Sequence, residues 1–199
     1  MQDAALELFG ERGYTRTTAA EVAERAGLTE RTFFRHFPDK REVLFANDEL
    51  RDRLAAAVAA APEGTAPVEA ITAGLNAAAV VLQGRREAVV RRARIIAAHA
   101  ELQERELTKL ASWSTALESV LRGRGLSRPT AKLAAEVSVA VFHVAYQRWL
   151  DERPERELVA TIHETFAELG DFIGHTAPGP QNGAPEPSPR TCGGHRLPE

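Results

Sequence analysis

Four polar side chains in one short segment have the types and the spacing needed to bind a polyanion. Arg31 and Arg35 lie four residues apart, and so do Thr32 and His36, so a helix would place the members of each pair on one side. Arginine can contact phosphates and guanine edges, and hydroxyl and imidazole groups can bind phosphate oxygens. The segment therefore predicts a face that enters a DNA major groove. The alternative is the solvated basic face of an ordinary helical hairpin.

The residues around this segment predict two short helices joined by a tight turn. Thr18 begins a Thr-x-x-Glu pattern, which is typical of a capping box at the start of a helix. Gly27 follows that helix, where a left-handed residue is needed, and Thr29 can cap the next helix. There Phe33 and Phe37, four residues apart, would form a buried stripe behind the basic face. This arrangement is a helix–turn–helix, whose second helix reads DNA.

The same part of the chain resembles the TetR family of bacterial regulators. The positions that match in order and spacing are Gly13, Tyr14, Thr17, Thr18, Val22, Ala23, Ala26, Gly27, Leu28, Thr32, Phe33, Phe34, His36, Phe37 and Lys40. The resemblance implies a double-stranded DNA operator as the partner. It also implies that the DNA contacts are Thr18, Glu30, Arg31, Thr32, Phe34, His36 and Lys40. The spacing argument adds Arg35 to this set.

Three features depart from the family's pattern. Members usually carry Tyr where this chain has Phe34, so a hydroxyl–phosphate bond worth about 1 kcal/mol is lost. Glu30 is acidic at a groove-facing position, where it can accept a hydrogen bond from cytosine N4 or serve as a capping-turn carboxylate. Members also carry more residues before the first helix, so either the true start lies upstream of Met1 or that helix is short.

Composition places the chain among soluble globular proteins. It has 199 residues, 44% hydrophobic and 27% charged, with a net charge of −3, which suits one ordinary domain or two small ones. Acidic and basic side chains nearly balance within residues 1–46, so we expect a local basic patch rather than a basic domain. The single cysteine, Cys192, excludes an internal disulfide. No membrane-length apolar run or signal peptide is visible, which predicts a cytoplasmic protein without a membrane partner.

The hydrophobic pattern predicts an all-α protein of about nine helices, with an N-terminal three-helix helix–turn–helix head and a C-terminal helical bundle. The expected parts are the DNA-binding head 1–46, an effector-binding and dimerisation domain 47–174, and a disordered Pro/Gly-rich tail 175–199. The expected helices after the motif cover 40–60, 68–83, 85–98, 101–122, 128–153 and 154–174. The first of them would link head and bundle continuously. The last two would form an antiparallel hairpin that pairs with a second copy, as the resemblance also implies for a homodimer.

Two groups of residues are candidates for a small-molecule site. A basic run, Arg85, Arg86, Arg91, Arg92 and Arg94, is either a solvated helix face or a site for an anionic effector. The C-terminal region loosely resembles acyl-CoA-responsive and mycofactocin-type regulators, with Arg94, Trp113 and Trp149 as shared features. The large side chains Phe142, Tyr146 and Trp149 lie at helical spacing and form either ordinary core or a pocket wall, in which His143 and Gln147 would supply polar atoms.

Catalytic motifs are missing from the sequence. It has no Gly-rich phosphate loop, nucleophile elbow or HExxH pair, and we interpret Glu104 and Glu106 as solvated. A metal site built from His175, Cys192 and His195 has poor spacing, so neither a metal nor a cofactor is expected. We therefore expect a homodimeric repressor of a palindromic operator, released by a small-molecule effector, and not an enzyme. The alternative is a helical small-molecule-binding protein with a weakened DNA-binding head.

Overall fold

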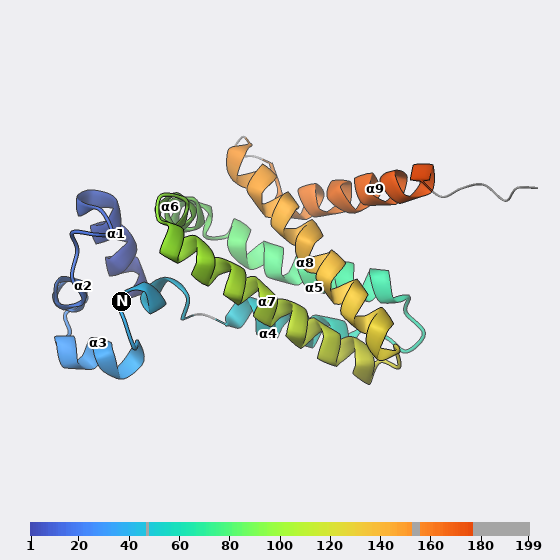
Figure 1. The fold of residues 1–199 in the computed structure, drawn as a ribbon, viewed down its shortest axis with the longest axis horizontal. Helices are drawn as coiled ribbons and strands as arrows, with labels where there is room; N and C mark the ends of the chain where they lie inside the picture. Colours follow the sequence, from blue (N-terminus) through green and yellow to red (C-terminus); the bar gives the residue numbers. More distant parts are fainter. Residues whose placement is uncertain (47, 153–155, 177–199) are drawn as a thin grey trace, which may run out of the picture.

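The computed structural model describes residues 1–46, 48–152 and 156–176, and within these ranges the chain is helical with no strand (Figure 1). The all-α prediction is therefore confirmed. The helices are α1 (Gln2–Arg12), α2 (Ala19–Arg25), α3 (Glu30–His36), α4 (Glu49–Ala60), α5 (Pro67–Gln83), α6 (Arg86–Ala97), α7 (Ala100–Gly123), α8 (Arg128–Asp151) and α9 (Leu158–Thr176), with a short 3-10 helix, η1 (Arg41–Leu44). None of these helices is long and apolar enough to cross a membrane.

Helices α1 to α3 form the head, and the local signals read from the sequence fold as expected. Thr18 and Glu21 make the full capping box of α2, and Gly27 adopts a φ of 69° after it. The Thr29 hydroxyl accepts the Thr32 N–H at the start of α3. Phe33 is fully buried behind that helix, so α3 presents its other side to solvent.

The head does not close its apolar core alone. Ile95 and Ile96 from α6 and Leu102 from α7 are buried in the same cluster as Phe9 and Val22. They lie at the corner where α6 meets α7, and Figure 1 shows this corner beside α1. Because apolar burial is the main stabilising term in folding, head and body are held together by a shared core.

The body packs α4, α5, α7, α8 and α9 around a second apolar core that includes Leu54, Leu75, Leu117 and Trp149. Helix α5 approaches α4 closely at Gly74. A Cβ atom there would lie 2.6 Å from Val58 Cγ2 and 2.9 Å from the Leu54 carbonyl oxygen. Helix α9 packs on both α8 and α5, and it begins beside the C-terminal part of α8 (Figure 1).

The expected continuous helix over 40–60 is wrong. Residues 41–44 form η1, Phe45 follows it, and α4 begins only at Glu49. The apolar residues of this stretch serve two different cores: Val43 and Phe45 are buried in the head, whereas Leu54 and Val58 are buried in the body. One straight helix cannot direct a single stripe at both.

The C-terminal boundaries also differ from the expectation. Helix α9 begins at Leu158 instead of 154 and continues to Thr176, two residues past the expected end. It diverges from α8 at a wide angle rather than lying along it as a simple antiparallel hairpin would (Figure 1). The predicted disordered tail lies, from residue 177 on, outside the described residues.

Candidate DNA-reading face and effector cavity

The outer face of α3 carries most of the predicted DNA contacts. Glu30, Arg31, Arg35 and His36 are exposed, and the ring of Phe34 is 49% exposed. Within the described part of the chain, the basic residues of the head that form ion pairs are Arg12, Arg25 and Arg41. Arg31 and Arg35 therefore have no acidic partner there, and their guanidinium groups are available to an external anion.

Three other predicted contacts are used inside the head. The Thr18 hydroxyl lies 2.9 Å from Glu21 Oε2, and the Thr32 hydroxyl lies 3.0 Å from that of Thr29. The Lys40 ammonium donates to the carbonyl oxygens of Tyr14 and Thr17, at 2.7 and 2.9 Å. Burial lowers the pKa of Lys40. These bonds fix the helix–turn–helix, and contact with DNA by these residues stays a prediction.

A cavity of about 170 Å³ lies between the head and the body. The head contributes Gln2, Asp3 and Leu6 of α1 and Val43 and Leu44 of η1, and the body provides the remaining wall. A second cavity of about 380 Å³ adjoins it. Arg92, Glu106, Leu110, His143, Tyr146 and Gln147 line both cavities, so these side chains form the boundary between the two spaces.

Five of the seven predicted effector residues line the first cavity: Trp113, Phe142, His143, Tyr146 and Gln147. Trp113 and Phe142 also pack ring against ring with centroids 5.1 Å apart, so these side chains both belong to the core and line the cavity, and their binding of an effector stays a prediction. Arg94 is exposed and, like Trp149, lies outside both cavities. These two residues are not retained as candidates.

Three basic residues, Arg85, Arg92 and Lys109, line the first cavity, and Arg92 also lines the second. Arg92 lies three residues after Val89 and four before Ile96, both buried, so it shares the apolar stripe of α6. That position was the signal in the sequence that could have identified it. Arg94 is two residues further on and lies on another side of the helix, where solvent surrounds it.

Arg92 and Glu106 form an ion pair across the cavity wall. Arg92 Nη1 and Nη2 lie 3.0 and 2.6 Å from the two oxygens of Glu106, and these side chains are only 19% and 24% exposed. The interpretation of Glu106 as solvated is therefore wrong. Burial opposes ionisation of Glu106, but the hydrogen bonds and charge of Arg92 outweigh it and lower the pKa of that carboxyl.

Further polar groups surround this pair. Burial, together with the charge of Arg92, lowers the pKa of Lys109 to about 8, and burial raises the pKa of Tyr146 to about 12. The indole N–H of Trp113 is buried and has no hydrogen-bond partner among the described residues. A buried donor without an acceptor is costly, so an acceptor on a ligand could satisfy it.

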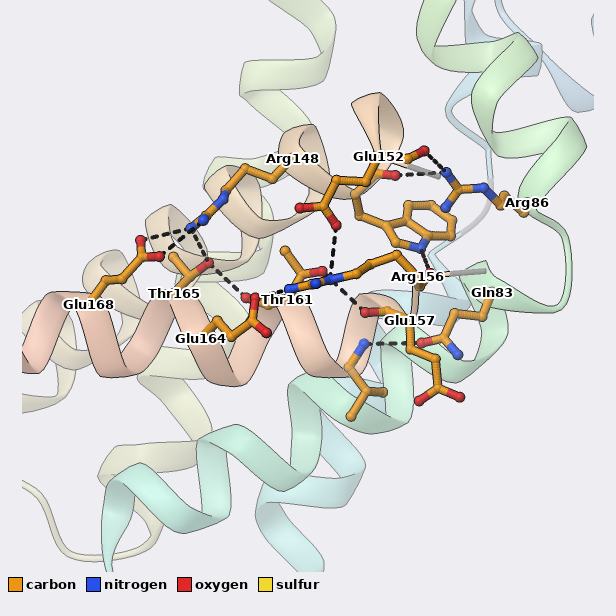
Figure 2. Close-up of polar contacts among 12 residues, drawn as sticks. Gln83, Arg86, Arg148, Glu152, Arg156, Glu157, Thr161, Glu164, Thr165 and Glu168 are labelled. Atoms are coloured by element: carbon orange, nitrogen blue, oxygen red, sulfur yellow. Dashed lines mark hydrogen bonds and ion pairs between the residues drawn. The ribbon is translucent and has the colours of Figure 1, made fainter. Parts of the chain in front are cut away.

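Arg86 and Trp149 have a structural role at the end of α8, shown in Figure 2. Arg86 Nη2 donates to the carbonyl oxygens of Trp149 and Glu152, each at 2.9 Å, and its guanidinium lies 4.3 Å from the Trp149 ring centroid. The Trp149 indole in turn donates to the carbonyl oxygen of Arg156 at 3.0 Å. The basic run is thus not simply a solvated face, because Arg86 caps α8 and both Arg85 and Arg92 line the first cavity.

A metal site can be assessed only in part. No group of three or more His, Cys, Asp or Glu side chains suited to a metal occurs in the described ranges. His175 lies in α9, whereas Cys192 and His195 fall outside the described residues.

Two protein-family models match the chain. Residues 2–46 match the model of bacterial regulatory proteins of the tetR family, and residues 65–173 match that of the MftR C-terminal domain. Among characterised relatives, the transcriptional regulator TcmR of Streptomyces glaucescens is 39% identical over 74 residues, 37% of this chain. The match spans only 33% of the length of TcmR.

Solved structures of similar fold cover nearly the whole chain. The complex of SmeT, from Stenotrophomonas maltophilia, with triclosan has a TM-score of 0.58 and 24% identity, and the alignment covers 95% of this chain and 97% of that one. FadR from Bacillus subtilis in complex with stearoyl-CoA has a TM-score of 0.59 and 17% identity, with 84% and 95% covered. Together with the exposed recognition helix, the matched models show that this chain belongs to the TetR family of DNA-binding transcriptional regulators.

Proposed function

We propose that the protein is a cytoplasmic, homodimeric repressor that binds a palindromic operator through α3 and leaves it when a small molecule enters the cavity. The observation that carries this proposal is the position of the cavity, whose wall includes Leu6, Val43 and Leu44 of the head as well as the body helices. A ligand there touches both parts. It would favour release only through a difference in affinity between the DNA-bound and free conformations.

The cavity favours a hydrophobic ligand that carries an anionic or acceptor group. Its wall is largely apolar. An anion could bind to Arg85, Arg92 or Lys109, and an acceptor could bind to the Trp113 N–H, which has no partner in the described part of the chain. An acyl-CoA ester or another hydrophobic anion fits this chemistry. The complexes of SmeT with triclosan and FadR with stearoyl-CoA, which share the fold, are consistent with such a role for the bundle.

Dimerisation through α8 and α9 is supported by an exposed apolar stripe. On α8, Leu133, Val137, Ala140 and Val144 follow one another at spacings of four, three and four residues, and Leu133 and Val144 are exposed. Such spacing is typical of helices that pack against partner helices. Two copies joined in this way would place their α3 helices about 34–36 Å apart, one turn of DNA.

The route from ligand to head must differ from the one that a continuous helix would give. Because α4 begins only at Glu49, it does not run from the head into the body as a single rigid rod. The contact of the cavity with α1 and η1 takes over that role in the proposed mechanism.

DNA binding should be tested by fluorescence anisotropy with an operator obtained by in vitro selection. Arg31→Ala and Arg35→Ala should each weaken binding about tenfold or more, and loss of a phosphate contact should lower the slope of log affinity against log salt by about 1. Arg53→Ala is the matched control, because Arg53 is an exposed arginine of α4 outside the head. Unchanged affinity in both α3 variants would refute the assigned DNA-reading face.

The second candidate is a small-molecule-binding protein with a weakened head. The observations in its favour are Phe34, which lacks a hydroxyl, and Lys40, whose ammonium is engaged by two backbone carbonyls. It predicts ligand binding to the purified protein without selection of any DNA sequence above background in the same experiment.

A further inference from the structure

Arg92 connects the cavity to the head through one rigid group. Its Nε donates to the carbonyl oxygen of Leu44 at 2.9 Å, while its two terminal nitrogens hold Glu106. The guanidinium also lies 5.0 Å from the ring centroid of Phe45. Leu44 ends η1, and Phe45 follows it in the head core. A single side chain of α6 therefore faces the cavity and fixes the segment through which the chain leaves the head.

We propose that Arg92 is a ligand-operated latch: a carboxylate on an apolar ligand in the cavity takes the guanidinium from Glu106 and from the Leu44 carbonyl, and thereby loosens η1. This inference rests on the proposed function, because it names the ligand class and the residue through which the cavity acts on the head.

The geometry of arginine makes the two contacts of Arg92 interdependent. The guanidinium is planar, and its five N–H donors have fixed directions. Turning the terminal fork toward a new carboxylate therefore also turns the Nε–H away from the Leu44 oxygen. A lysine at this position would still attract a carboxylate, but it could not link the two contacts in this way.

A ligand carboxylate can replace Glu106 without leaving an isolated buried charge. Losing one partner of a buried ion pair is strongly destabilising when the other charge stays uncompensated. Lys109 acts electrostatically on Glu106 and stabilises its ionised form. When Arg92 turns to the ligand, Lys109 therefore still compensates the negative charge of Glu106.

A second arginine provides a matched control outside the cavity. Arg105 binds Glu42 of η1 through two bonds of 2.7 and 2.8 Å and lies 5.1 Å from the ring centroid of Phe45. It lines neither of the two cavities. Arg105 therefore holds the same segment as Arg92 but has no contact with the ligand space.

The test compares decanoate with decanol, which differ in the anionic group. Calorimetry should show that wild-type protein binds decanoate about tenfold more tightly than decanol, as expected for one charge-assisted pair. Amide exchange should show faster exchange at Phe45, whose N–H donates to the Glu42 carbonyl at 3.0 Å, when decanoate is bound and no change with decanol.

Three variants distinguish binding of the ligand carboxylate from the proposed loosening of η1. Arg92→Lys should keep the preference for decanoate while Phe45 exchange no longer responds to it, whereas Arg105→Lys should keep both. The double variant Arg92→Gln/Glu106→Gln, which removes both members of the ion pair, should show a smaller preference for decanoate than the wild type, because Lys109 remains in the wall.

Equal binding of the two probes to wild type, no binding of decanoate, or an Arg92→Lys protein whose exchange still responds would each overturn the proposal. Operator binding is measured in a separate experiment. If the protein is not a DNA-binding regulator, it will not bind an operator, but the decanoate, decanol and exchange results will be unchanged.

Discussion

Replacing Arg86 by Met should destabilise the body by removing the cap on α8 (Figure 2). Two charge-assisted hydrogen bonds at 2.9 Å would be lost, each worth about 1.5–3 kcal/mol. The contact of the guanidinium with the Trp149 ring contributes about a further 0.5–2 kcal/mol. The C-terminal carbonyls of α8, which carry partial negative charge, would also lose their nearby cation.

Several effects reduce the simple sum. Met keeps much of the packing of the arginine stem. It also removes the buried Nη1, which has no partner among the described residues. We therefore expect a net loss of about 2–3 kcal/mol, which corresponds to a fall in Tm of about 4–12 °C for a chain of this size.

The assay is thermal unfolding followed by circular dichroism at one fixed protomer concentration, since the proposed dimer would make Tm depend on concentration. Arg94→Met is the matched control, because Arg94 is an exposed arginine of the same helix. Its free energy of unfolding should change by less than about 0.5 kcal/mol. Equal Tm values for the two variants would refute the capping role of Arg86.

Two further stability measurements test the packing and the buried charge. Gly74→Ala should lower the free energy of unfolding in urea by about 1–3 kcal/mol, because its Cβ would overlap Val58, whereas Gly10→Ala, with ordinary contacts, should raise it by up to about 1 kcal/mol. Burial lowers the pKa of Lys109 from 10.5 to about 8. Between these two pH values the folded protein therefore binds fewer protons than the unfolded chain. The contribution of Lys109 to stability consequently rises with pH over this range. Lys109→Met should remove this rise in urea titrations between pH 7.5 and 9.5, and an identical pH profile in the variant would contradict the assignment.

The sequence predicted the head well because its signals are local. The Thr18 capping box, Gly27 and the Phe33 stripe each depend on residues within one or two helical turns, and the fold uses all three as expected. Most of the aromatic cavity residues were also found, because large side chains at helical spacing identify a buried face.

The misplaced features depend on contacts between distant segments. Arg92 lies in an apolar stripe, but its partners are the Leu44 carbonyl, 48 residues away, and Glu106, 14 residues away. Nothing in the spacing of the α6 arginines pairs any of them with these groups. Val43 and Leu54 similarly fit one apolar stripe over 40–60, and only their burial in two separate cores explains why no single helix covers this stretch.

The shared core between the head and the α6–α7 corner bears on how such regulators can be recombined. A fragment ending at residue 46 would lack Ile95, Ile96 and Leu102 and would leave their contacts on Phe9 and its neighbours open to water. A chimaera that grafts this reading head onto the body of another regulator must therefore transplant the corner with it, or match its three apolar side chains.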